Sequence, residues 1–354
     1  MKDRIKKVHK LMDENSLDGF LVDSPESRYY LSGFTGTAGR ILFTEKQDYF
    51  LTDFRYVQQA NEQTEGYKIL EINKNFEVKL NELIQEYGIN KLGFESKAVT
   101  YQQYEKYDQY IEAGLVATQD YIEKLRLIKD DSEVDKIKKA VEISDKAFEH
   151  ILGFIKPGIS ERDLALELEF YMKRLGAEKN AFDFIVASGK RSSLPHGVAT
   201  EKQIENGDFV TMDFGAFYQG YCSDITRTVV IGEASEKQKE IYGIVLNAQL
   251  KVIEKIKAAM TCVEVDDIAR AMIVEAGYKD NFGHGLGHGI GLEVHEGPRV
   301  SFTSEDTLEV GMVVTDEPGI YLPNWGGVRI EDDLLITEQG CQVLNKAPKD
   351  LIVL

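Results

Sequence analysis

The stretch GDFVTMDFG at residues 207–215 recurs as GMVVTDEPG at residues 311–319, at an offset of 104 positions. Glycine, valine, threonine, an acidic residue and a second glycine coincide in the two copies. A solenoid repeat is much shorter, typically about 20 to 50 residues. The long period therefore predicts two duplicated halves of one domain around a pseudo-two-fold axis, so that residues facing this axis come in pairs.

Signals for helix starts recur at nearly the same offset. A serine followed three positions later by an acid forms a capping box, and this pattern predicts helices that begin at Ser132, with Asp135, and at Ser160. About 103 residues later, Ser235 again marks a helix start, and a further predicted helix contains Asp266. The helices thus repeat together with the strands.

The first 126 residues have a different pattern, in which short apolar runs alternate with amphipathic stretches. Such runs predict strands, whereas apolar residues at every third or fourth position predict helices. The predicted strands span residues 19–23, 40–44, 48–52 and 91–95, and the predicted helices span residues 5–15 and 75–88. We expect an α/β domain at residues 1–126 and the duplicated domain at residues 127–354, an α/β (α+β) architecture overall.

Composition limits the classes of function. A chain of 354 residues, 43% of them hydrophobic, is long enough for two domains with proper cores. The formal net charge of -18 argues against binding to nucleic acid or anionic membranes, which requires excess lysine and arginine. The start MKDRIKKVHKLMDEN lacks an apolar run, and no stretch approaches the ~20 apolar residues of a membrane span. With scattered cysteines and no C-x-x-C pair, these features predict a cytoplasmic protein.

Four acidic residues fall in two matched hairpins. Asp213 ends a β-rich stretch, and Asp224 lies eleven positions later on the expected return strand, YCSDITRTVVI. In the second half Glu317 takes the place of Asp213, and Glu331 lies on the following strand in GVRIEDDLLI. Side chains alternate along a strand. One face of the first return strand therefore carries Cys222, Asp224, Thr226 and Thr228.

Each of these acids alone could be an ordinary hydrogen-bonded residue at the end of a strand. Their repetition favours a shared site, because four ionised carboxylates brought together at the axis would repel one another. Two divalent cations would balance the charge. Oxygen ligands with one imidazole suit Mn²⁺, Co²⁺ or Fe²⁺ better than a closed structural zinc site, although Zn²⁺ is also compatible.

The imidazole is expected from NFGHGLGHGIGLEVHEG at residues 281–297. The segment fits neither the G-x-G-x-x-G nor the H-E-x-x-H motif. Glycines let the backbone pass close to a metal cluster. We predict His288 as a metal ligand and His295 as a group that contacts substrate or handles protons, with His284 in a supporting or packing role. His196, in SSLPHG of the first half, could face the same site from the other side.

The chain resembles the M24 peptidases, the "pita-bread" family that includes Xaa-Pro aminopeptidases, Xaa-Pro dipeptidases (prolidases) and methionine aminopeptidases. MDFG, SDITRT, GHGIGLEVHE, TDEPGIY and VRIEDD occur in the family's order and spacing, from about residue 127 to the end. In the amino-terminal part, SPESRYYLSGFTGTAGRILFT and LTDFRYVQQA resemble the creatinase-type domain that precedes the catalytic domain in Xaa-Pro peptidases. The resemblance implies two pseudo-symmetric halves around a curved antiparallel sheet.

The resemblance also implies residue roles. The implied ligands of a dinuclear metal site are Asp213, Asp224, His288, Glu317 and Glu331, with Asp224 and Glu331 as the bridging pair. From the donor set we expect Mn²⁺ first, with Co²⁺, Zn²⁺ or Fe²⁺ as alternatives. It implies attack by a metal-activated water on the carbonyl before proline, an oxyanion stabilised by His196 or His295, and proton transfer by Glu317. Two interpretations of Arg329 are open: it orients the site by pairing with a ligand carboxylate, or it forms a plain structural salt bridge.

Alternatives from other classes are a metal-free creatinase-type hydrolase and a non-catalytic peptide-binding protein; the complete ligand set argues against both. The choice between a dipeptidase and an aminopeptidase that acts on longer Xaa-Pro peptides depends on a cation near the proline carboxylate. Arg55 and Arg329 are the candidates. Expected partners are small proline-containing peptides and, by resemblance, a second copy in a homodimer. His284 and Thr226 are assigned to substrate contact or support, while Trp325 could line the cleft or pack.

Overall fold

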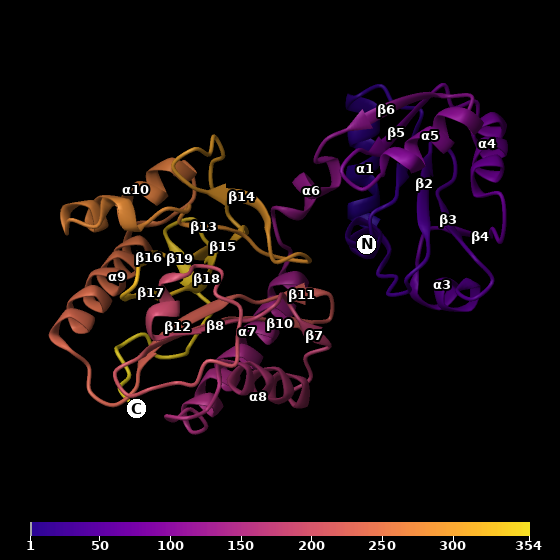
Figure 1. Ribbon diagram of the computed structural model, residues 1–354. Helices are drawn as coiled ribbons and strands as arrows, with labels where there is room; N and C mark the ends of the chain where they lie inside the picture. The colour runs from indigo at the N-terminus through magenta and orange to yellow at the C-terminus, as the bar shows by residue number, and fades with distance from the viewer. Residues whose placement is uncertain (1) are drawn as a thin grey trace. The chain divides into compact units, whose positions relative to one another are not determined.

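The computed structural model describes residues 2–354 (Figure 1). The chain divides into two compact units, Met1–Arg126 and Leu127–Leu354, which we call unit 1 and unit 2. Within residues 2–354, no helix combines the length and apolar character that crossing a bilayer would demand.

Unit 1 is built around a mixed six-stranded sheet with strand order β4-β3-β2-β1-β5-β6. Its strands are β1 Gly19–Val22, β2 Arg40–Thr44, β3 Tyr49–Thr52, β4 Lys68–Glu71, β5 Lys91–Glu95 and β6 Gly114–Thr118. Its helices are α1 Lys2–Glu14, α2 Pro25–Ser32, α3 Val57–Gln63, α4 Phe76–Tyr87, α5 Tyr101–Tyr110 and α6 Tyr121–Arg126. Each strand and helix predicted for this part of the sequence is present, with ends that differ by three residues or fewer.

The central strands of unit 1 form because their residues are apolar on both faces. All four residues of β1, GFLV, are buried, and β1 pairs with β2 in antiparallel and with β5 in parallel orientation. Strands covered on both faces have continuous apolar runs rather than alternating ones.

Unit 2 shows the duplication that the repeat predicts. Its first half contains α7 Asp131–Leu152, α8 Glu161–Arg174, β7 Lys179–Asn180, β8 Ile185–Ser188, η1 Gly189–Ser193, β9 Phe209–Phe214, β10 Ala216–Tyr218, β11 Tyr221–Cys222 and β12 Ile225–Val230. Its second half contains α9 Glu236–Lys255, α10 Cys262–Glu275, η2 Lys279–Asn281, β13 Gly287–Gly289, β14 Glu296–Val300, β15 Val313–Asp316, β16 Gly319–Leu322, β17 Gly326–Arg329, β18 Asp332–Ile336 and β19 Cys341–Val343.

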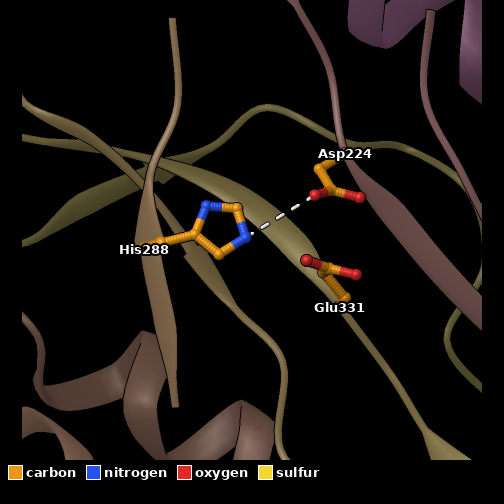
Figure 2. A group of neighbouring side chains, drawn as sticks. All are labelled: Asp224, His288 and Glu331. Carbon is orange, nitrogen blue, oxygen red and sulfur yellow. Dashed lines mark ion pairs between the residues drawn. The ribbon is translucent and has the colours of Figure 1, made fainter. Parts of the chain in front are cut away.

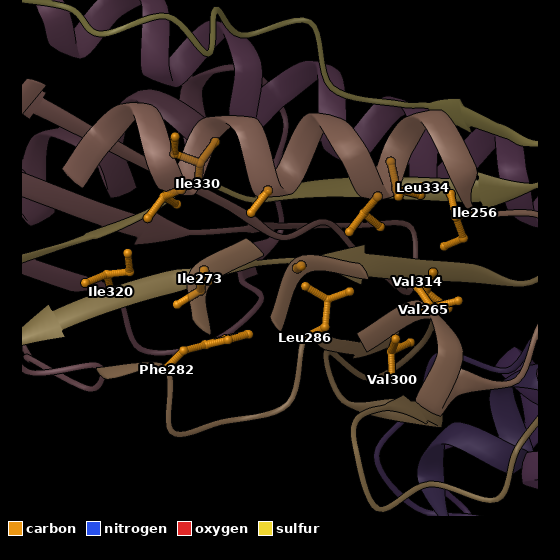
Figure 3. Close-up of a cluster of buried hydrophobic side chains, with 14 of the residues drawn as sticks. Ile256, Val265, Ile273, Phe282, Leu286, Val300, Val314, Ile320, Ile330 and Leu334 are labelled. Atoms are coloured by element: carbon orange, nitrogen blue, oxygen red, sulfur yellow. The ribbon is translucent and has the colours of Figure 1, made fainter. Parts of the chain in front are cut away.

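The two halves repeat one strand arrangement. In the first half β9 lies between β12 and β8, and in the second half β15 lies between β18 and β13, all antiparallel. Helices α7 and α8 share a hydrophobic core with β8, β9 and β12. Helices α9 and α10 share another with the second-half strands, which Figure 3 shows.

One predicted helix start is wrong by two residues. The capping box of α7 is formed by Asp130 and Glu133, not by Ser132 and Asp135. Both pairs have the required spacing, and the chain places Asp130 in the extended conformation that an N-cap residue needs. The serine lies in the first turn instead, and its hydroxyl donates to Asp130 at 2.6 Å. Ser160 and Ser235 cap α8 and α9 as predicted.

Candidate metal centre

Unit 2 contains a cavity of about 780 Å³. It is lined by nine of the ten residues that the sequence analysis assigned to the site: His196, Asp213, Asp224, His284, His288, His295, Glu317, Arg329 and Glu331. The tenth, Thr226, is fully buried on β12, and its hydroxyl donates to Glu331 Oε2 at 2.6 Å.

The two repeated hairpins carry the four acids to this cavity. Asp213 lies on β9 opposite Thr226, and Glu317 directly follows β15. Asp224 and Glu331 each stand immediately before the return strand of their hairpin. The backbone N–H of Glu331 donates to Thr226 O at 3.1 Å, which joins the two halves beside the acids. The convergence therefore follows from the duplication.

One acid from each hairpin meets an imidazole. Figure 2 shows Asp224, His288 and Glu331 pointing toward one another from three separate segments, and one ligand atom of each lies within 4.8 Å of the other two. His288 Nε2 is 3.7 Å from Asp224 Oδ2 and 3.5 Å from Glu317 Oε1. His288 Nδ1 lies 3.1 Å from its neighbour's carbonyl, Gly289 O, so that Nε2 faces the acids.

Gly287, beside His288, allows two strands to approach closely. A Cβ on Gly287 would lie 2.1 Å from Thr315 O, so this glycine lets β13 approach the backbone at β15. The approach also brings Thr315 Oγ1 within reach of the backbone N–H of His288, at 3.1 Å.

Replacement of Gly287 by alanine is therefore expected to destabilise the protein by about 1 to 3 kcal/mol, the usual cost of overpacking. Displacement of β13 should also weaken metal binding through His288. Gly283 is the matched control, because a Cβ there meets nothing within 4 Å. Urea denaturation of the two variants checks this. Equal stability of Gly287→Ala and Gly283→Ala would contradict the steric argument.

Arg329 organises one side of the cavity. Its Nη2 pairs with Asp213 Oδ2, Nε donates to Thr226 Oγ1 at 3.0 Å, and Nη1 donates to the Tyr321 hydroxyl at 2.7 Å. Since Thr226 donates in turn to Glu331, the arginine is connected to acids of both hairpins. Arg329 thus pairs with an acid that lines the cavity.

Burial and repulsion raise the pKa values of Asp224, Glu317 and Glu331. Burial raises the pKa of Asp224 well above its usual value, and the charges of Glu331 and Asp213 raise it further. Burial likewise raises the pKa of Glu331, and raises that of Glu317 to about 8 against the opposing effect of Arg329. Nearby cations would relieve both effects.

The chain's residues fit a pair of divalent cations. Asp213 Oδ1 and Asp224 Oδ1 are buried without a hydrogen-bond partner, which is costly unless another ligand group satisfies them. Burial lowers the pKa of His288 to about 4, so the imidazole is neutral at pH 7 and can offer a lone pair to a metal. Four carboxylates and one neutral imidazole form the oxygen-rich donor set that the sequence analysis expected.

The other histidines take different places around the cavity. His284 Nδ1 lies 2.8 Å from Gly285 O and Nε2 lies 3.0 Å from the Tyr321 hydroxyl, so both its nitrogens are engaged. The His295 ring stands edge-on to that of His288, with centroids 4.4 Å apart. His196 lines the cavity from the first half. His295 and His196 thus both line the cavity.

Tyr321 and Arg299 are among the cavity residues that the sequence analysis did not assign to the site. Tyr321 links Arg329 to His284 through its hydroxyl, and the TDEPGIY stretch that contains it was the available signal. Arg299 lines the cavity with an exposed side chain and forms no ion pair with any residue from 2 to 354. It pairs with His288 across the strands, and no local pattern marks it.

Three other residues named from the sequence have structural partners. Arg55, in unit 1, forms a two-point ion pair with its near neighbour Asp53, with Nη2 to Oδ2 at 2.8 Å. Trp325 packs edge-on against Phe209, with centroids 5.8 Å apart. Cys222 is a buried side chain in unit 2. Packing accounts for Trp325 and Cys222.

Comparison with known proteins gives two family matches. Residues 135–338 match Metallopeptidase family M24, and residues 4–128 match the Creatinase/Prolidase N-terminal domain. The chain is 52% identical to a structure of a Xaa-Pro dipeptidase from Bacillus anthracis, with a TM-score of 0.98, over 100% of this chain and 99% of that one.

Two further relatives extend the likeness. An X-Pro aminopeptidase structure from Thermotoga maritima is 41% identical, with a TM-score of 0.91, over 96% of this chain and 98% of that one. A Xaa-Pro dipeptidase of Pyrococcus furiosus is 44% identical over 99% of this chain and 100% of its own length. The predicted fold class, an α/β amino-terminal part before a duplicated pita-bread part, is confirmed.

Proposed function

The chain belongs to metallopeptidase family M24, and from this premise we propose that it is a metal-dependent Xaa-Pro dipeptidase that hydrolyses the peptide bond before proline. The observation that carries the proposal is the meeting of Asp224, His288 and Glu331 ligand atoms within 4.8 Å in the cavity. We assign residues 127–354 as the catalytic domain and residues 1–126 as the creatinase-like domain. The metal-free and non-catalytic alternatives would not need this donor set.

We assign the metal pair to the five residues that the sequence analysis expected: Asp213, Asp224, His288, Glu317 and Glu331. His288 Nε2 lies 3.7 Å from Asp224 Oδ2 and 3.5 Å from Glu317 Oε1, which supports a metal site shared by the two hairpins. Divalent ions held by these residues would supply Lewis acidity, which lowers the pKa of a bound water and polarises a carbonyl. We propose Mn²⁺ as the native ion, because a donor set of mostly carboxylates with one imidazole suits it.

The remaining groups serve the substrate. The oxyanion that forms at the scissile carbonyl needs a hydrogen-bond donor, and His295 and His196 in the cavity wall are assigned to this role. Glu317 is assigned to carry a proton to the proline nitrogen as it leaves. Arg329 pairs with Asp213, and we assign it to positioning this acid.

Arg299 supports the choice of a dipeptidase. The carboxylate of a dipeptide substrate needs a cation, and both candidates from the sequence, Arg55 and Arg329, already pair with acids. Arg299 lines the cavity and has no acidic partner among the described residues. We therefore propose that its guanidinium binds the proline carboxylate of the substrate.

Replacement of Arg299 by methionine is expected to lower kcat/KM for Ala-Pro by about 10- to 100-fold, since a hydrogen bond to a charged group contributes about 1.5 to 3 kcal/mol. Hydrolysis of Ala-Pro-Ala, whose proline carbonyl is an amide, should change little. Arg299→Lys, which keeps the charge, should lie between. Equal losses on both peptides would contradict the assignment.

The proposed function itself is tested by initial rates on Ala-Pro and Ala-Pro-Ala with Mn²⁺-loaded protein and a chelator-treated control. Metal-dependent cleavage with a strong preference for the dipeptide over the longer peptide is expected. A strong preference for the longer peptide would indicate an aminopeptidase instead of a dipeptidase, and cleavage of neither peptide would contradict the proposal.

The family resemblance also supports a homodimer, and the three free cysteines of residues 2–354 support a cytoplasmic location. Light scattering and cell fractionation test these two proposals.

A further inference from the structure

Each half of unit 2 contains a buried acid that faces a histidine-bearing segment. Glu161, the first residue of α8, and Asp266, on α10, are both 0% exposed. Each pairs with an arginine, Glu161 with Arg191 and Asp266 with Arg270. Neither pair lines the cavity or contacts a proposed metal ligand through its side chains, so the proposed chemistry does not explain them.

The Asp266–Arg270 pair holds the glycine-rich segment by its backbone. Arg270 Nη1 donates to Phe282 O at 2.9 Å, and Nη2 donates to His284 O at 2.7 Å. The guanidinium lies between two aromatic rings, 4.3 Å from the centroid of Phe282 and 4.6 Å from that of Phe302. This stacking fixes the plane in which the two donors point.

The acid of the pair extends the connection to two metal-ligand positions. Asp266 Oδ1 accepts the backbone N–H of Leu286 at 2.9 Å, and Leu286 O accepts the backbone N–H of Glu317 at 2.8 Å. Leu286 is two residues before His288. The pair therefore fixes the position of the backbone just before His288. Through one further hydrogen bond, it also fixes the position of the Glu317 backbone.

The Glu161–Arg191 pair holds the base of the segment that carries His196. Glu161 Oε1 accepts the backbone N–H of Ser188 at 2.7 Å, and Oε2 accepts that of Thr200 at 3.1 Å. Arg191 Nε lies 3.0 Å from Glu161 Oε2, and its Nη2 donates to Val198 O at 2.6 Å. The two ends of the segment 188–200 are thus tied to one carboxylate, with His196 between them.

We propose that these two ion pairs are separate positioning devices of the two halves. The Asp266–Arg270 pair positions His288 and Glu317 for metal, and the Glu161–Arg191 pair positions His196 for substrate. This inference rests on the proposed function of the cavity. The segments need such support because glycine side chains provide no anchoring contacts, while groups around metal ligands and reacting atoms must be held closely.

The two devices predict different losses, which Arg270→Lys and Arg191→Lys separate. Lysine keeps the positive charge but lacks the planar fork that reaches the acid and a carbonyl together. Arg270→Lys is expected to weaken Mn²⁺ binding, measured by calorimetry on the full chain, by about 10- to 100-fold. Arg191→Lys is expected to keep the Mn²⁺ affinity within about twofold of that of the wild type. It should lower kcat/KM for Ala-Pro, measured at saturating Mn²⁺, by about tenfold.

Arg162→Met is the control, because it removes an exposed ion pair with Glu201 next to Glu161 without touching either device. It should change neither quantity. Equal effects of Arg270→Lys and Arg191→Lys on both quantities, or loss of thermal stability alone, would overturn the inference. Wild-type protein that neither binds Mn²⁺ nor cleaves Ala-Pro would instead contradict the proposed function, so the two failures are distinguishable.

Discussion

Replacement of Asp224 by asparagine is expected to lower kcat for Ala-Pro by at least about 10³-fold and to reduce the bound metal below two ions per chain. Asparagine has nearly the same shape, but its neutral amide is a poorer metal ligand than a carboxylate. Loss of groups that merely orient ligands costs about 10- to 100-fold, and loss of a bridging ligand should cost more. Metal content by mass spectrometry and initial rates check this result.

The matched control is Asp183→Asn, because Asp183 is an exposed acid that lines the same cavity outside the proposed ligand set. This variant should retain the metal content of the wild type. If Asp224→Asn kept full activity and two bound ions, the metal centre would have to be placed elsewhere. If both variants lost metal equally, general negative charge in the cavity would be the cause.

The second large effect is expected in the metal-free protein, whose stability should fall as the pH rises above about 6.5. The pKa of Glu317 is raised from 4.5 to about 8, and those of Asp224 and Glu331 are also raised. The folded state thus binds these protons more tightly than the unfolded chain. Between the two pKa values of such a group, stability falls by about 1.4 kcal/mol per pH unit.

The histidines give the opposite slope at lower pH. Burial lowers the pKa of His284 and His288 from 6.5 to about 4, so their contribution is lost as the pH falls from 6.5 toward 4. Below pH 6.5, the rise in stability with pH that the histidines cause offsets the fall that the acids cause. Above pH 6.5, only the fall remains. The net decline of the metal-free protein should therefore appear between pH 6.5 and pH 8.

Urea denaturation of chelator-treated and Mn²⁺-loaded protein across this range tests the argument. Bound metal should remove the decline and add about 4 kcal/mol of stability at a free concentration 1,000 times its Kd. Metal-free Asp224→Asn should be more stable than the metal-free wild type at pH 8, because folding no longer requires this acid to stay protonated or to bury its charge. Stability that rises from pH 6.5 to pH 8 without metal would show that the pKa values of these acids are not raised in the folded protein.

The sequence by itself determined the duplication and the candidate site residues. The match of residues 207–215 with 311–319 indicated paired hairpins, and alternation along a strand placed Asp224 and Thr226 on one face. Such predictions succeed because strand periodicity and helix capping depend on residues close together in the chain. The start of α7 is the exception. Ser132 and Asp130 are each followed three positions later by an acid, and only the folded backbone shows that Asp130 is the N-cap residue.

The tertiary structure decided which distant residues meet. Arg329 could have paired with several acids, and it pairs with Asp213, which lies 116 positions earlier. Arg299 reaches the cavity because β14 pairs with β13, and Asp266 reaches Leu286 because α10 packs beside the glycine-rich segment. These contacts depend on strand register and on how helices pack against sheets. Both arise from burial summed over a whole half of the domain, so no local stretch of sequence specifies them.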